Sequence, residues 1–213
     1  DVLKDLVLFY SSSEKKMVTL KEYVSRMKED QTSIYYACGD TIERIDQLPQ
    51  TEMLRDKGYE ILYLTDNVDE FALKMVGKYD DKDFKNISSD ELNLETEEEK
   101  KEAEKQVEDN KDMLDFMTEA LDGKVKAVRL SQRLKSHPVC ISSEGAITLE
   151  MEKVLNAMPA TDKVQAQRVL ELNANHPIFA KLTQLFQDDK EKLKSYTQLL
   201  YTQAMMIEGF PVE

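Results

Sequence analysis

The sequence predicts an α/β fold followed by an α+β fold: a small three-layer α/β/α unit with parallel strands, and then a helix-rich α+β domain. Two segments rich in strand-forming residues, 33–38 and 59–65, are separated by a helical segment. A helix that connects two strands implies parallel pairing with a right-handed crossover. Both segments carry few charges, as is typical of strands covered on both faces. After Ser88 the composition shifts to Glu, Asp and Lys, which indicates a boundary between domains.

The first predicted domain covers residues 1–92. Its expected elements are, in order, a helix that ends near residues 10–13, a helix over 19–27, a strand over 33–38, a helix over 41–57 interrupted at Pro49, a strand over 59–65 and a helix that ends at Val76. Thr19 with Glu22 three residues later forms a capping box. Gly58 and Gly77 are suited to end helices. The candidate N-caps of the remaining helices are Asp40, Asp66 and Asn67.

Residues 93–112 are predicted to form an acidic helical linker, because Glu97 and Lys101 stand at the i,i+4 spacing of a helix. The second predicted domain covers residues 113–213. Its expected elements are a helix over 113–121, strands over 125–130 and 138–142, a helix over 147–158, a strand over 168–172, a helix that is capped by Asn175 and ends near Phe186, and an amphipathic helix over 189–208.

The balance of charge limits the classes of partner. The 213 residues carry a formal net charge of −13. Nucleic acid and anionic membranes are therefore not expected as partners, because both bind an excess of Lys and Arg. The two cysteines are too few for a disulfide framework, and no secretory segment is visible, so we expect a cytoplasmic location. The chain begins without an initiator Met, inside an apolar-periodic stretch, which suggests a segment of a longer protein.

No catalytic residue and no metal ligand is predicted. His137 and His176 each stand next to a proline, and neither has a Cys, Asp or Glu at metal-ligand spacing. The glycines stand singly, unlike those of a phosphate-binding loop. Cys38 ends a predicted parallel strand, where α/β enzymes often place reactive residues. Its commoner role is that of a small buried apolar residue.

Two features point to binding. Phe71 begins a predicted helix and follows the acidic residue Glu70. Further along, an apolar helix face is formed by Ile147, Met151, Val154 and Leu155. Flexible Met side chains on such a face suit contacts with varied partners. The spacing alone favours a different interpretation, in which this face is part of a buried core.

Many segments match one family in the same order along the chain. They are residues 18–28, 34–36, 59–66, 68–71, 125–134, 168–173, 176–177 and 199–201. Over nearly its whole length the chain resembles the heat-shock protein 90 chaperones, and its short acidic segment is similar to their bacterial branch. The resemblance implies that residues 1–92 are the end of the family's middle domain and that residues 113–213 are its C-terminal dimerization domain.

The resemblance also assigns roles to particular positions. It implies client binding by an acidic-aromatic pair, Glu70 and Phe71, and by the amphipathic helix that carries Ile147, Met151, Val154 and Leu155. The implied dimer interface lies on the last helix, at Leu199, Leu200, Gln203, Met206 and Ile207. A second helix of that interface would follow residue 213, so we expect weak or absent native dimerization of this chain. ATP and Mg²⁺ are implied for the parent protein, with no cofactor in this segment.

Three hypotheses follow from the sequence and the resemblance. The first is a chaperone segment that binds partly folded client proteins and contributes to the homodimer of an ATP-dependent parent. The second is a purely structural assembly module without affinity for clients. The third is an enzyme with Cys38 as nucleophile, which requires a thiol more reactive than that of free cysteine.

Overall fold

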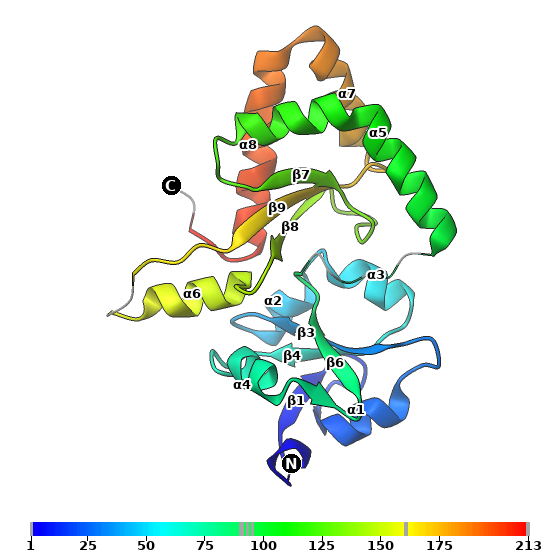
Figure 1. Ribbon diagram of the computed structural model, residues 1–213, viewed down its shortest axis with the longest axis vertical. Helices are drawn as coiled ribbons and strands as arrows, with labels where there is room; N and C mark the ends of the chain where they lie inside the picture. The colour runs from blue at the N-terminus through cyan, green and yellow to red at the C-terminus, as the bar shows by residue number, and fades with distance from the viewer. Residues whose placement is uncertain (1, 90–91, 93, 95, 160–161, 212–213) are drawn as a thin grey trace. The chain divides into compact units, whose positions relative to one another are not determined.

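Two β-sheets organise the chain, one in each of two compact units. The computed structural model describes residues 2–89, 92, 94, 96–159 and 162–211 (Figure 1). Unit 1 comprises residues 1–92 together with 148–165, and unit 2 comprises 93–147 together with 166–213. The helix over residues 149–157 therefore belongs to unit 1 by its contacts, although unit 2 surrounds it in the sequence.

Unit 1 is built around a six-stranded sheet. Its elements are a 3₁₀-helix (Val2–Asp5), β1 (Leu8–Ser11), β2 (Met17–Thr19), α1 (Leu20–Arg26), β3 (Ser33–Cys38), α2 (Ile42–Asp46), α3 (Thr51–Asp56), β4 (Ile61–Leu64), α4 (Asp69–Val76), β5 (Lys78–Tyr79), β6 (Lys82–Asn86) and α6 (Leu149–Ala157). The strand order is β2-β1-β4-β3-β6-β5. The apolar core beside this sheet contains Phe9, Val18, Leu20, Tyr23, Ile34, Tyr36, Leu62, Leu64 and Leu73.

The pairing of strands is mixed. The predicted parallel pair is confirmed, with Tyr36 of β3 opposite Leu62 of β4. A second parallel partner of β3, β6, was not expected from the sequence. Strands β1, β2 and β5 pair antiparallel to their neighbours, so the sheet is not parallel throughout. The expected three-layer arrangement stays a prediction.

The predicted first helix is wrong in its type. Beyond a short 3₁₀-helix the chain enters strand β1, where Phe9 lies opposite Val18 of β2 and both side chains are buried. Leu6, an apolar residue within the predicted first helix, is exposed. Pairing with β2 and β4 satisfies the backbone of β1 while burying Phe9, and these non-local gains outweigh a short helical pattern.

Several local signals are confirmed. Thr19 and Glu22 form the predicted capping box of α1. Gly58 and Gly77 follow α3 and α4 with positive φ angles of 65° and 72°. The predicted caps of the two other helices are wrong by one or two positions. Thr41 caps α2, and Val68, which has no side-chain cap bond, precedes α4.

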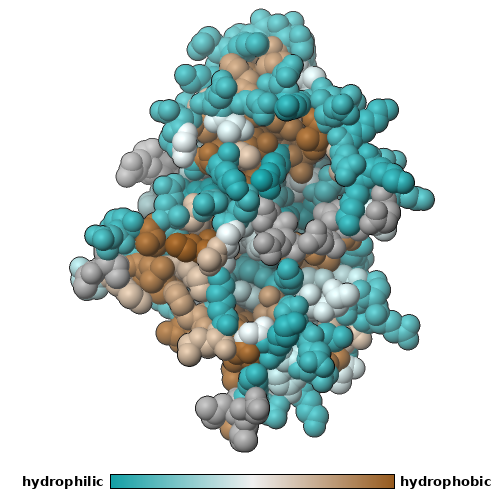
Figure 2. Space-filling model, in the orientation of Figure 1, coloured by the Kyte–Doolittle hydropathy of each residue, from teal (hydrophilic) through white to brown (hydrophobic). Residues whose placement is uncertain are grey.

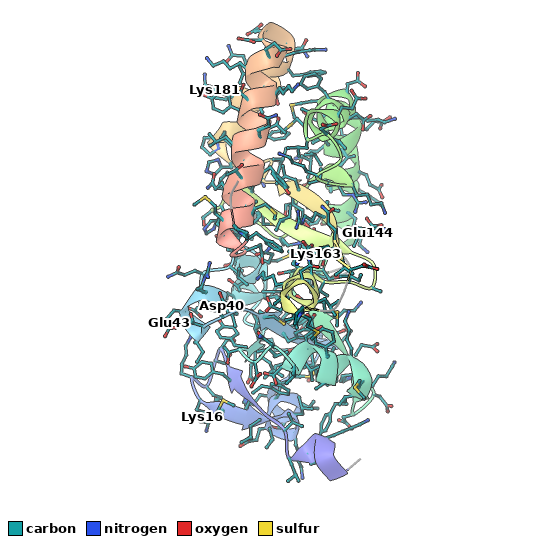
Figure 3. The ribbon with its side chains drawn as sticks, turned by 90° about the vertical axis from the view of Figure 1, so that its left-hand side faces the viewer. Lys16, Asp40, Glu43, Glu144, Lys163 and Lys181 are labelled. Carbon is teal, nitrogen blue, oxygen red and sulfur yellow. The ribbon has the colours of Figure 1, made fainter. Side chains whose placement is uncertain are left out.

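Asp40 has a different partner from the one predicted. Its Oδ2 lies 2.9 Å from Nη1 of Arg44, one turn further along α2 (Figure 3). Thr41 can take the cap because its hydroxyl accepts a hydrogen bond from the backbone N of Arg44.

Unit 2 contains a three-stranded sheet and three helices. Its elements are α5 (Glu97–Ala120), β7 (Ala127–Leu130), β8 (Val139–Glu144), β9 (Gln167–Leu172), α7 (Pro177–Asp188) and α8 (Lys190–Ile207). Strand β9 is central, parallel to β7 and antiparallel to β8. His176, and not Asn175, caps α7, because its Nδ1 accepts a hydrogen bond from the backbone N of Ile178.

The acidic segment is not separate from the helix after it. Residues 97–120 form the single helix α5, which begins at a capping box between Thr96 and Glu99. Its early turns are mostly exposed, whereas Met113, Leu114 and Met117 are buried. The sequence suggested two elements because apolar residues start only in the last turns. No helix in the described part of the chain combines the length and apolar character that a membrane span requires.

A buried tyrosine hydroxyl holds three segments of unit 1 together. Tyr23 is fully buried, and its Oη donates a hydrogen bond to the backbone oxygen of Glu60 at 2.7 Å. The same oxygen accepts hydrogen bonds from Nε2 of Gln31 and from the backbone N of Tyr35. Helix α1 is therefore tied to β3 and to the segment before β4.

The substitution Tyr23→Phe tests this role. It leaves one acceptor and two donors without their hydrogen-bond partner, so we expect the free energy of unfolding to fall by about 2 kcal/mol. Urea unfolding followed by circular dichroism measures the change. Tyr10→Phe is the matched control, because Tyr10 is half-buried in the same sheet and its ring stacks on Tyr63. Equal stability of the two variants would contradict the assignment.

Candidate functional site

The Glu70 carboxylate lies at the centre of a buried hydrogen-bond network. Glu70, on the first turn of α4, is 2% exposed. Its Oε1 accepts hydrogen bonds from Oη of Tyr36 at 3.0 Å and from Nδ2 of Asn86 at 2.7 Å. Its Oε2 accepts a hydrogen bond from Oγ1 of Thr148 at 2.6 Å. The donors come from β3, β6 and the start of α6, so one side chain connects four elements.

Thr148 makes a second hydrogen bond. Its Oγ1 accepts from the backbone N of Met151 at 3.2 Å, which caps α6. The same hydroxyl therefore starts the helix and attaches it to Glu70. The sequence offered Thr148 only as one residue of a helical stretch, because its partner lies 78 positions away.

Helix α4 presents an apolar stripe to solvent. Val68, Phe71 and Met75 follow the i, i+3, i+7 spacing of one helix face. Val68 and Met75 are exposed, Met75 to 89% of its surface, and Phe71 is half-buried. Phe71 was predicted from the sequence and Met75 was not, although a Met four residues after an aromatic residue was a usable signal.

Helix α6 carries the other predicted apolar face. Ile147, Val154 and Leu155 are half-buried, and Met158 just beyond the helix is 47% exposed. Met151 is buried and faces the interior of unit 1. Figure 2 shows hydrophobic residues gathered over α6 and near α4. The α6 face is thus divided: its first turns pack inward, and its last turns remain open.

Two of the six proposed client contacts are consequently not on the surface. Glu70 is enclosed by its donors, and Met151 is part of the packed side of α6. A buried carboxylate with three hydrogen-bond donors serves to hold elements in place. In the sequence a buried acid and an exposed one look alike at the start of a helix.

The proposed interface on α8 is also divided between two faces. Leu199 and Met206 are 61% and 58% exposed, and Gln203 lies between them on the same side. Ile207 is half-buried. Leu200 is 2% exposed and belongs to the core of unit 2.

The exposed α8 residues extend to Tyr196, which was predicted on the apolar stripe of this helix but was not assigned to the interface. Tyr196 precedes Leu199 by one turn and is partly exposed. It lines a groove of about 320 Å³ between α7 and α8, together with Ile178, Lys181, Leu182, Gln184, Leu185, Asp188 and Lys192. Lys181, labelled in Figure 3, is one of the lining residues from α7.

Cys38 does not have the surroundings of a nucleophile. It ends β3, and burial raises the pKa of its thiol well above the usual range, with a further contribution from the Glu70 carboxylate. A reactive cysteine needs the opposite shift, because the thiolate is the attacking species. Cys140 is buried, and burial raises the pKa of its thiol in the same way.

Metal binding finds no support in the described ranges. Among the residues that the structure places, no group of three or more His, Cys, Asp or Glu side chains is arranged to hold a metal ion. His176 instead caps α7 through its Nδ1.

Comparisons with known proteins agree on one family. A family model described as "Hsp90 protein" matches residues 1–213. The chain is 59% identical over 213 residues to the Chaperone protein HtpG of Clostridium acetobutylicum and 56% identical over 213 residues to that of Bacillus subtilis. Each match covers 100% of this chain and 34% of the relative. The chain thus spans about a third of the length of these relatives.

The raised pKa of Cys38 leads to a prediction about thiol reactivity. At pH 7.5 a higher pKa leaves less thiolate, so we expect Cys38 to be alkylated at least about tenfold more slowly than free cysteine. Peptide mapping by mass spectrometry separates Cys38 from Cys140 during iodoacetamide labelling. The urea-unfolded chain is the control, in which both thiols should react at the free rate. Faster labelling of Cys38 in the folded chain would restore the enzyme hypothesis.

Proposed function

The chain belongs to the Hsp90 family, and we propose that it binds partly folded client proteins and contributes to the homodimer of a longer, ATP-dependent chaperone. The observation that carries the first part is the apolar surface on α4 and α6, defined by Val68, Phe71, Met75, Val154, Leu155 and Met158. Three of these residues are exposed and three are half-buried, and apolar residues gathered at a surface, as in Figure 2, commonly mark interaction sites.

The chemistry of this surface suits partly folded chains. Such chains expose apolar side chains that a folded protein buries, and covering one Met or Leu contributes roughly 1.5–3 kcal/mol. Met75 and Met158 are flexible and polarizable, so they adapt to partners of different shape. The net charge of −13 disfavours nucleic acid as the occupant.

Self-association is proposed for α8. Tyr196, Leu199, Gln203 and Met206 form a continuous exposed stripe over about three turns of the helix. A helix stripe can pair with its own copy around a two-fold axis, because the same patch then serves both subunits. Leu200 supports this stripe from the core and makes no contact across the proposed interface.

The remaining activities concern the longer protein. We propose that it hydrolyses ATP with Mg²⁺, and no residue of this chain is given a catalytic role. A cytoplasmic location is proposed as well, and two unpaired cysteines suit a reducing compartment.

Client binding is tested by titrating the chain with a fluorescently labelled, partly folded model protein. The double variant Met75→Ser, Met158→Ser removes the two most exposed methionines of the proposed surface, so we expect roughly tenfold weaker binding. Met17→Ser is the matched control, because Met17 is 54% exposed on β2. Its affinity should equal that of the parent chain.

Two results of this titration would contradict the proposal. If the double variant binds as well as the parent chain, the client surface lies elsewhere. If the parent chain does not bind, the assembly-module hypothesis replaces it. Circular dichroism establishes that all variants are folded.

Self-association is tested by sedimentation velocity over a range of concentrations. Leu199→Glu places two like charges near each other across a two-fold interface, so we expect the dimer dissociation constant to rise at least about tenfold. Val107→Glu is the control, because Val107 is an exposed apolar residue of α5 in the same unit. Equal effects of the two substitutions would reject α8 as the interface.

A further inference from the structure

The two oxygens of the Glu70 carboxylate have different partners. Oε1 accepts hydrogen bonds from Tyr36 on β3 and from Asn86 on β6, two strands that are adjacent in the unit 1 sheet. Oε2 accepts the hydrogen bond from Thr148. One oxygen thus fixes α4 to the sheet, and the other fixes α6 to α4. A buried carboxylate oxygen that loses its donor costs more than the average hydrogen bond contributes, so α6 is held firmly at this point.

The attachment of α6 is coupled to its folding. The Thr148 hydroxyl donates to Glu70 and accepts from the backbone of Met151, so both bonds depend on one rotamer of one side chain. Thr148 and the next two apolar positions, Leu149 and Met151, are buried. The first turn of α6 is therefore the part of the helix that is packed within unit 1.

The other end of α6 is hydrogen-bonded to the residues that follow it in the chain. Asn156 exchanges hydrogen bonds with the backbone of Val164, donating at 2.8 Å and accepting at 2.9 Å. Lys163 donates to the backbone oxygen of Asn156 (Figure 3). These bonds shape the turn after the helix, whereas the bond to Glu70 determines where the helix sits on unit 1.

We propose that Glu70 and Thr148 are positioning residues for client binding: their hydrogen bond sets which face of α6 is open to a client. The inference rests on the proposed function and assigns Glu70 a role inside the fold. With the bond in place, Met151 packs inward while Val154, Leu155 and Met158 remain accessible. A helix already held in this orientation spares the client the cost of ordering it.

The substitution Thr148→Val tests the inference, because it keeps the side-chain shape and removes both hydrogen bonds of the hydroxyl. We expect hydrogen exchange of the α6 amides to become about tenfold faster and client affinity to fall at least about threefold. Thr148→Ser retains the hydroxyl and should restore both. Thr41→Val is the matched control, because Thr41 caps α2 through a hydrogen bond of the same 3.2 Å length and lies on a different helix of unit 1.

The outcomes separate this inference from the proposed function. Unchanged α6 exchange in Thr148→Val overturns the inference. Faster exchange of the α6 amides with equal or tighter client binding also overturns it. In that case the hydrogen bond would stabilise α6 but would not affect client binding. Failure of the parent chain to bind any client rejects the proposed function and the positioning role together, and the hydrogen exchange then reports only on how α6 is held.

Discussion

The placement of Glu70 is the constraint on which unit 1 depends. Removing a carboxylate from water is costly unless its oxygens are hydrogen-bonded. Here the three donors come from β3, β6 and the start of α6, so the carboxylate is satisfied only when all of these elements are in position. An apolar contact would tolerate a shift of α6 by a fraction of a turn, whereas a hydrogen bond of 2.6 Å would not. Because hydrogen bonds are directional and apolar contacts are not, the polar network fixes the position of α6 more closely than the apolar core can.

The same arrangement recurs elsewhere in the chain. In unit 1, Arg26 holds the Glu60 carboxylate with two hydrogen bonds, and Ser11 of β1 donates to the same group. In unit 2, the buried carboxylate of Glu171 on β9 pairs with Nε of Arg133 at 3.1 Å. Each acid connects a strand to segments that are distant in sequence. Bidentate and buried pairs of this kind fix geometry even where their net contribution to stability is small.

The elements that were predicted correctly have local signals in the sequence. The capping box at Thr19 and the glycine after α4 depend on residues within one turn, and both are in place. Strand β1 was missed because its partners in β4 lie about fifty residues away. For the candidate surfaces, the sequence located α4, α6 and α8 but could not assign the faces. Leu199 and Leu200 are adjacent, and only the packing of unit 2 shows that the first is exposed and the second buried.

The proposed client surface combines buried, hydrogen-bonded residues with flexible, exposed methionines. Glu70 and Thr148 are hydrogen-bonded to each other, and the first turn of α6 is buried. Met75 and Met158 are its exposed methionines, and their long unbranched side chains can change rotamer without disturbing the buried residues. A surface that was flexible throughout would have to be ordered by every client, and one that was rigid throughout would fit few of them. The hydrogen bonds involve buried side chains and the two methionines are exposed, so a methionine can change rotamer while the Glu70 network stays intact.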